Sequence, residues 1–125
     1  MPYRIEISSE PEKLEVKYFG KVTEDEYRAA IIEFIEKKGG SKYLLVLTDC
    51  LEMNIGPSVL DVYERINMYE KLGIDTETKE AILIPADQIV VENVKFYETA
   101  CLNRGYNVRI FENRKEAIEW LKLFE

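Results

Sequence analysis

The chain has 125 residues, of which 46% are hydrophobic and 33% are charged, and its formal net charge is −7. This length favours one domain over residues 1–125, with a core large enough to form without metal or disulfide staples. The negative charge argues against nucleic acid and anionic membranes as partners, because both attract basic proteins. The chain has no histidine, which removes the commonest general base and the commonest zinc ligand.

The same observations predict a cytoplasmic protein. No basic segment followed by an apolar one opens the chain, so we expect no signal peptide, and no apolar run is long enough to span a bilayer. The two cysteines, Cys50 and Cys101, are not expected to form a disulfide in a reducing compartment. No metal site is evident, and no cofactor is expected.

Two alternating segments at the start of the chain predict an antiparallel hairpin. Residues 3–7 and 14–18 alternate apolar and polar side chains, which is the pattern of half-buried strands, and turn-forming residues separate them. Thr23 and Glu26 then form a capping-box pattern that begins an amphipathic helix. Gly39-Gly40 are expected to end that helix.

The central strand is predicted at residues 43–49, a nearly unbroken apolar run with a polar end. Such a run is typical of a strand buried on both faces. In open α/β sheets, binding sites form beyond the carboxyl ends of the central strands, so the loop that follows is the candidate site. The loop residues that we expect to contact a partner or ligand are Asp49, Cys50, Asn54 and Ser58.

A second helix is predicted over residues 59–72, with Ser58 as its cap. One apolar stripe of this helix is expected to face the core, and a second stripe flanks it. The second stripe contains Leu60, Glu64, Met68 and Leu72, of which Glu64 is the charged member. It is either part of a wide core face, which burial tendencies favour, or an exposed patch for a partner or a second copy.

The rest of the chain alternates strands with helices. A buried strand is predicted at residues 80–84, a helix capped by Asp87 follows, and an outer strand is predicted at residues 106–111. Asn113 and Glu116 form a second capping-box pattern that begins the final helix. The order β-β-α-β-α-β-α-β-α indicates an α/β fold. We expect a mixed, mostly parallel five-stranded sheet with an antiparallel N-terminal strand, flanked by helices.

Several residues could carry chemistry, but none predicts catalysis. Asp49 ends a strand as a phospho-acceptor would, yet the acidic pair and lysine that such chemistry needs are missing, so it is expected to bond loop amides. A buried, unreactive Cys50 is more common than an exposed, reactive one. Tyr27, Tyr63 and Tyr97 fall on predicted core stripes, with hydroxyl groups that reach water.

Three features of the chain resemble a known family. They are the element order, the strand at residues 44–49 with the loop and helix that follow it, and the ending at residues 108–121. In that ending, a strand is followed by Glu-Ala-Ile-Glu-Trp-Leu. These features resemble the STAS family, and more closely its SpoIIAA-like branch, which is grouped with Sec14-type lipid-binding folds. In anti-sigma antagonists of that family, a serine at the start of the helix after the central strand is phosphorylated by a partner kinase. The matching pair here is Asn54-Ile55, which has no hydroxyl, and Ser58 is better explained as a helix cap.

The resemblance implies a non-catalytic protein-interaction or regulatory module. Its partner would be a protein or a second copy of the chain in a homodimer. The alternative, which follows from the Sec14 side of the resemblance, is a module that binds a small apolar ligand or a lipid. That alternative requires an apolar pocket near the carboxyl ends of the central strands. An enzyme is not expected, since only Asp49, Cys50 and scattered carboxylates could serve.

Overall fold

The computed structural model describes residues 2–38, 45–54 and 58–124. Three predicted features, the helix stop at Gly39-Gly40, the first two residues of the 43–49 strand and residues 55–57 of the loop, lie outside these ranges. The described elements are β1 (Tyr3–Ser8), β2 (Lys13–Gly20), α1 (Glu24–Lys38), β3 (Leu45–Met53), α2 (Val59–Leu72), β4 (Lys79–Leu83), α3 (Gln88–Asn103), β5 (Asn107–Phe111) and α4 (Arg114–Lys122).

The sheet has the strand order β1-β2-β3-β4-β5. β1 runs antiparallel to β2, with Tyr3 opposite Tyr18, and the pairs β2–β3, β3–β4 and β4–β5 are parallel. The predicted mixed, mostly parallel sheet is therefore confirmed. The hairpin forms one edge of the sheet and β5 forms the other.

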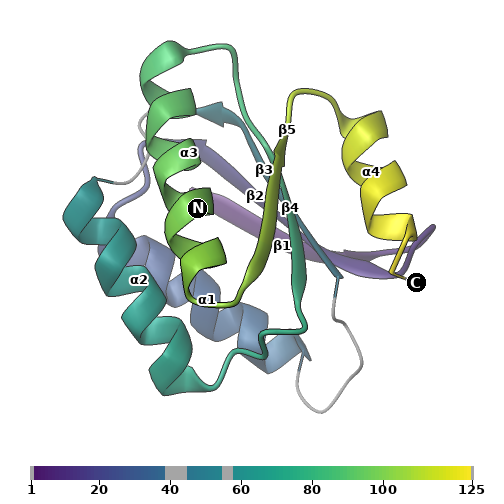
Figure 1. The fold of residues 1–125 in the computed structure, drawn as a ribbon, viewed down its shortest axis with the longest axis horizontal. Helices are drawn as coiled ribbons and strands as arrows, with labels where there is room; N and C mark the ends of the chain where they lie inside the picture. The colour runs from purple at the N-terminus through teal and green to yellow at the C-terminus, as the bar shows by residue number, and fades with distance from the viewer. Residues whose placement is uncertain (1, 39–44, 55–57, 125) are drawn as a thin grey trace.

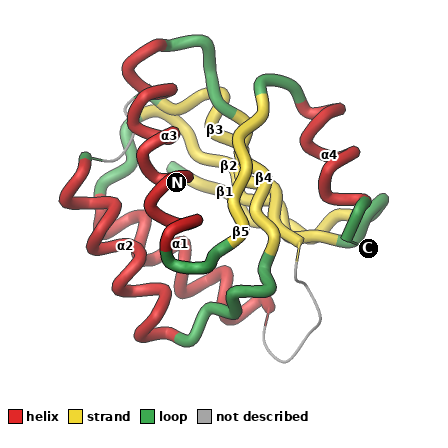
Figure 2. The backbone as a smooth tube through the Cα atoms, viewed as in Figure 1, coloured by secondary structure: helices red, strands yellow, loops and turns green. Residues whose placement is uncertain are grey.

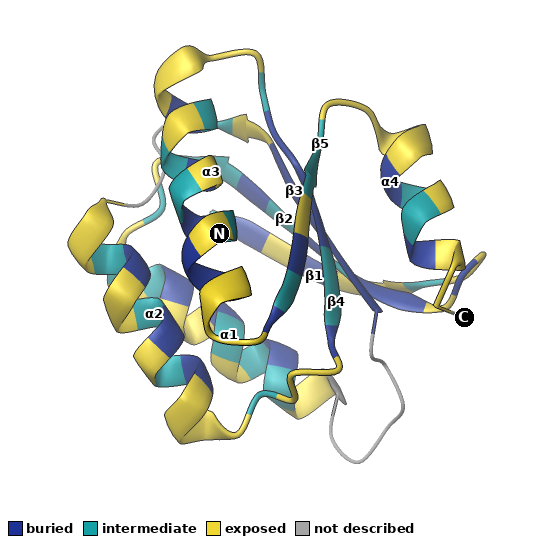
Figure 3. Cartoon of the chain, viewed as in Figure 1, coloured by how far each residue is buried: buried dark blue, intermediate teal, exposed yellow. Residues whose placement is uncertain are grey.

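Helices cover both faces of the sheet, but unequally (Figure 1). α1, α2 and α3 lie on one side, and α4 lies alone on the other. Because side chains alternate along a strand, β3 contributes to two cores. Val46 and Cys50 belong to the larger core under α1–α3, while Leu45 and Leu47 belong to the smaller core under α4. Figure 3 shows the central strands as largely buried, and residues 45–50 of β3 are buried on both faces, as predicted.

The central strand is longer than its sequence indicates. The prediction ended the strand at Asp49, but β3 continues to Met53, so residues 50–53 are strand and not loop (Figure 2). The cause is pairing with β2, which continues past an irregularity in the register so that Gly20 lies opposite Met53. The amide of Asn54 then donates to the carbonyl of Gly20 at 2.9 Å and closes the pairing.

The predicted helix caps are present. The hydroxyl of Thr23 accepts from the amide of Glu26 at 3.2 Å, and the carboxylate of Glu26 accepts from the amide of Thr23 at 3.0 Å. Ser58 and Asp61 form the same reciprocal pair at the start of α2, with both distances at 3.1 Å. Asp87 caps α3 with one side-chain oxygen. At α4, Asn113 accepts from the amide of Glu116 at 2.9 Å, so one of the two hydrogen bonds of the predicted capping box is present.

Candidate functional site

A cavity of about 250 Å³ lies between the sheet and the three helices that cover one of its faces, α1, α2 and α3. Three neighbouring strands form its floor through Tyr18 of β2, Thr48 of β3 and Ile82 of β4. Tyr18 and Ile82 lie in the carboxyl-terminal halves of their strands, as do Cys50 and Met53 of β3, which also line the cavity. The cavity therefore occurs near the end of the sheet where α/β folds usually form binding sites.

The three helices supply the walls of the cavity. Tyr27 of α1, Arg65 of α2, and Val94 and Tyr97 of α3 line it. Tyr27, Val94 and Tyr97 are buried, because they lie on the core-facing stripes of their helices. The position of the cavity thus follows from the packing of three amphipathic helices on one sheet.

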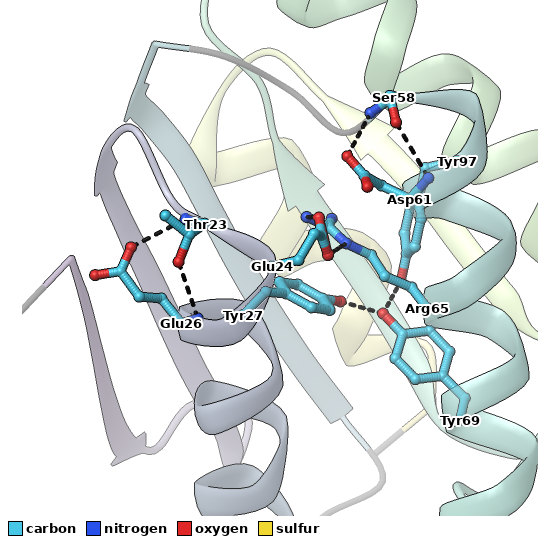
Figure 4. A network of polar contacts seen from close by, with 9 residues as sticks. All are labelled: Thr23, Glu24, Glu26, Tyr27, Ser58, Asp61, Arg65, Tyr69 and Tyr97. Carbon is cyan, nitrogen blue, oxygen red and sulfur yellow. Dashed lines mark hydrogen bonds and ion pairs between the residues drawn. The ribbon is translucent and has the colours of Figure 1, made fainter.

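A chain of buried hydroxyl groups leads to a carboxylate beside the cavity. The hydroxyl of Tyr97 donates to Oε1 of Glu80 at 3.0 Å, and the hydroxyl of Thr48 donates to Oε2 at 2.6 Å. The hydroxyl of Tyr69 lies 2.9 Å from that of Tyr97 and also contacts that of Tyr27 (Figure 4). The predicted contact of the Tyr27 and Tyr97 hydroxyls with water is therefore wrong, since both bond within the core.

Each tyrosine hydroxyl has one proton, which fixes the direction of donation along the chain. Tyr97 gives its proton to Glu80, so Tyr69 must donate to Tyr97 and Tyr27 must donate to Tyr69. Burial raises the pKa of all three tyrosines well above the ordinary value, which keeps them protonated. The whole chain therefore points its donors toward Glu80.

Glu80 is the central charged group of this arrangement. Burial raises the pKa of its carboxyl group, while the hydrogen bonds from Thr48 and Tyr97 and the charge of Arg65 act in the opposite direction. The residue keeps part of its surface exposed and lines the cavity. It can therefore meet a molecule that enters.

Arg65 connects two helices at the mouth of the cavity. Its Nη2 lies 2.8 Å from Oε1 of Glu24 on α1, and its Nε lies 3.2 Å from Oε2, so the pair is bidentate (Figure 4). The guanidinium also lies 3.6 Å from the ring centroid of Tyr27, a cation–π distance. The two contacts hold Arg65 in place and neutralise its charge locally.

Of the four loop residues chosen from the sequence, the structure brings only Cys50 to the cavity. Cys50 is buried, and burial raises the pKa of its thiol to about 12, with smaller effects from the charges of Glu80 and Asp49. The thiol is therefore protonated at neutral pH and a poor nucleophile. This agrees with the favoured interpretation of Cys50 as a buried, unreactive residue.

The other three loop residues lie elsewhere. Asp49 is one position out of phase with Cys50, so it lies on the α4 side of the sheet, where Oδ1 accepts from the amide of Leu51 at 3.0 Å, as predicted. Asn54 and Ser58 are exposed and are not among the residues that line the cavity. Ser58 acts as the N-cap of α2.

The second stripe of α2 is divided between the core and the surface. Leu60 is 66% exposed and Leu72 is 45% exposed, and Glu64 is also exposed, whereas Met68 is half-buried against the larger core. The wide-core interpretation therefore holds for Met68 alone. Tyr63, which was expected in the core, is 47% exposed and packs its ring edge against Phe96.

Sequence reasoning did not find Glu80 or Arg65. One signal could have indicated Glu80: it precedes Ile82 and Ile84 on the same face of a predicted buried strand, where a carboxylate is unusual. Arg65 carries no such signal, since its partner Glu24 is 41 residues away.

The described residues contain neither a cluster of metal ligands nor a membrane-spanning helix. Residues 2–38, 45–54 and 58–124 contain no group of three or more His, Cys, Asp or Glu side chains placed to hold a metal ion. No helix in these ranges has the length and apolar character needed to cross a membrane.

Comparison with known proteins places the chain in a family. The family model described as SpoIIAA-like matches residues 13–122. A solved structure of an uncharacterized protein of the DUF3478 family with a SpoIIAA-like fold, from Shewanella loihica PV-4, is 22% identical, with a TM-score of 0.68. The similarity covers 95% of this chain and 93% of that protein. None of the curated proteins compared matches significantly. The family match extends from β2 to α4, so this chain belongs to the SpoIIAA-like family.

Proposed function

We propose that this protein is a non-catalytic regulatory module that binds a small organic molecule in the cavity beside Glu80. The observation that carries the proposal is a cavity of about 250 Å³ with tyrosine walls and the hydrogen-bonded carboxylate of Glu80. Small-molecule sites are typically concave and mostly apolar, with a few polar groups that orient the ligand. The cavity has this composition.

The chemistry of the lining groups favours binding over catalysis. The thiol of Cys50 and the hydroxyls of Tyr27 and Tyr97 hold their protons, because burial raises their pKa values. Arg65 is engaged by Glu24. Glu80 accepts two hydrogen bonds from its own fold. These groups can orient a ligand, and none of them is an activated nucleophile.

The size of the cavity limits the ligand. A water molecule occupies about 30 Å³ of the liquid, so about 250 Å³ has room for about eight water molecules. A compact molecule with roughly that number of non-hydrogen atoms fits. This favours a small ring compound over the long acyl chain of a lipid.

The test is a titration of the isotope-labelled protein with benzyl alcohol, a neutral ring compound of about this size, followed by amide NMR. We expect saturable shifts centred on Thr48, Cys50 and Tyr97. The variant Val22→Trp should abolish them, because Val22 is half-buried and lines the cavity, so a larger ring there fills the space. Leu102→Trp is the matched control, since Leu102 is 51% exposed and lies outside the lining. Shifts that are scattered, or that survive in Val22→Trp, would contradict the proposal.

A second candidate function is self-association through α2. Val59, Leu60 and Tyr63 are 56%, 66% and 47% exposed, so three large apolar side chains lie together near the start of one helix. Exposed apolar patches of this kind often mark interfaces. We infer that the occupant would be a second copy of the chain, which would bury the same helix from both sides.

A further inference from the structure

We propose that the ligand of this cavity is a small organic cation, a protonated amine or amidine on a compact apolar body, whose N–H groups bind the carboxylate of Glu80. This inference rests on the proposed function and names the chemical class of the ligand. Four observations carry it: the unused acceptors of Glu80, the lack of a cation paired with it among the described residues, the aromatic walls and the charge balance of the lining.

The first observation concerns hydrogen bonding at Glu80. A carboxylate offers about four acceptor positions, and here Thr48 and Tyr97 use one on each oxygen. The remaining positions belong to a partly exposed side chain on the cavity lining. The protein thus holds the carboxylate in one orientation and leaves acceptors for a ligand that donates. The N–H groups of an amine supply such donors.

The second observation concerns charge. None of the ion pairs among the described residues includes Glu80. Neither of the two cations that line the same cavity, Lys21 and Arg65, forms an ion pair with Glu80, and Arg65 directs two of its N–H groups to Glu24. A carboxylate removed from water without a paired cation is costly, and a ligand that supplies the cation offsets that cost. A neutral ligand of the same shape would not.

The third observation concerns the walls. Tyr18, Tyr27 and Tyr97 present aromatic rings to the cavity, and the rings of Tyr18 and Tyr27 stack at a centroid distance of 5.8 Å. Aromatic faces attract cations. The guanidinium of Arg65 over Tyr27 is an example within this site. The walls can therefore hold the apolar body of the ligand and also stabilise its charge.

The fourth observation concerns the balance of charges in the lining. Two cations, Lys21 and Arg65, face three carboxylates, Glu24, Asp61 and Glu80, which leaves one net negative charge when all are ionised. The whole chain has a net charge of −7, which also attracts cations. An anionic ligand that paired with Arg65 would have to displace Glu24 and would then meet Glu80.

The experiment compares three probes of nearly equal size by NMR titration at about pH 8, because a higher pH favours the ionised carboxylate. They are benzylamine, which is a cation, benzyl alcohol, which is neutral, and benzoate, which is an anion. We expect benzylamine to bind roughly tenfold or more tightly than benzyl alcohol, because its hydrogen bond to Glu80 is charge-assisted. We expect benzoate to bind more weakly than either.

The variant Glu80→Gln should reduce the preference for benzylamine to near unity while benzyl alcohol still binds, which shows that the cavity is intact. Glu64→Gln is the matched control, since it changes the net charge equally at an exposed position outside the cavity. It should retain the preference. If Glu80→Gln does not fold, the ranking of the three probes on the native protein decides the question.

The other outcomes separate this inference from the proposed function. Benzyl alcohol or benzoate binding in the cavity as tightly as benzylamine would overturn the cation inference and leave the ligand-binding function standing. Equal loss of benzylamine binding in Glu80→Gln and Glu64→Gln would also overturn it, because long-range charge would then explain the preference. If none of the probes binds in the cavity, both proposals fail.

Discussion

Glu80 is the residue on which the larger core and the candidate site both depend. Its carboxylate receives donors from Thr48 on the neighbouring strand and from Tyr97 on α3, and through Tyr97 it is linked to Tyr69 and Tyr27. One acidic side chain therefore connects β3, β4 and all three helices of this face. Such a network fixes the relative positions of these elements, and its energy depends on whether the carboxyl group is charged.

Glu80 should make the stability of the protein depend on pH. Burial raises its pKa in the folded state, so the folded protein binds this proton more tightly than the unfolded chain does. The contribution of Glu80 to folding stability is complete below the pKa that Glu80 has in the unfolded chain. It is lost as the pH rises through the higher pKa that Glu80 has in the folded protein. Glutamine does not titrate. The melting temperature of Glu80→Gln relative to the native protein should therefore increase as the pH rises.

The measurement is thermal unfolding of the native protein and Glu80→Gln between about pH 4 and pH 8. A change of about 1 kcal/mol moves the melting temperature of a domain of this size by roughly 4 °C, which is measurable. Glu64→Gln, at an exposed position, should show a nearly constant difference from the native protein. A constant or decreasing difference for Glu80→Gln would show that burial does not penalise the charged carboxylate.

The residues of the site were hidden from sequence reasoning because they meet over long separations. Arg65 and Glu24 are 41 residues apart, Tyr27 and Tyr69 are 42 apart, and Thr48 and Glu80 are 32 apart. Helical patterns correctly placed Tyr27 and Tyr97 on core-facing stripes. They carry no information about which polar tips meet after the elements pack.

At the scale of elements, local sequence signals predicted where the helices begin. The end of the central strand depends instead on its pairing with a strand that is distant in sequence. A capping box involves residues three positions apart, so Thr23 and Glu26 could be recognised directly. The end of β3 depends on how far β2 continues beside it, and that partner is distant in sequence. The candidate loop was therefore placed too early, and Cys50 became part of the cavity floor.

The apolar surface of α2 leads to a prediction about assembly. If two copies meet through this helix, Leu60→Asp should convert the dimer to a monomer, because it places a charge at an apolar contact. Its effect on the unfolding free energy of the monomer should stay within about 0.5 kcal/mol, since Leu60 is 66% exposed. Native mass spectrometry over a range of protein concentrations measures the assembly state.

Leu102→Asp is the matched control for this prediction, because Leu102 is 51% exposed on α3. It should leave the assembly unchanged. A native protein that stays monomeric at every concentration, or a dimer that persists in Leu60→Asp, would exclude self-association through this part of α2.

At the scale of the whole molecule, two cores of unequal size share one sheet. Leu47 and Leu83 face α4, while the residues next to them on the same strands face the larger core. Arg114, at the start of α4, also pairs with Glu15 on β2. Loss of α4 would expose the face of β3 and β4 that carries Leu47 and Leu83. The opposite face of the same strands supports the larger core, so we expect the two cores to unfold together.

Trp120 allows this coupling to be measured. It is the one tryptophan of the chain, and it packs against Phe111 and Phe124 on the α4 face, with ring centroids 5.7 and 5.2 Å away. Its fluorescence reports the smaller core, whereas far-ultraviolet circular dichroism reports all the helices. We expect the two signals to give the same midpoint in urea.

Leu121→Ala tests this coupling under stress. Leu121 is fully buried on the inner face of α4, so its truncation should cost about 2–5 kcal/mol, while Leu123→Ala should cost little because Leu123 is 76% exposed. In a cooperative molecule, the fluorescence and dichroism midpoints of Leu121→Ala fall together. If the fluorescence midpoint falls alone, α4 detaches before the rest unfolds. The ligand cavity on the opposite face would then not depend on α4 for its stability.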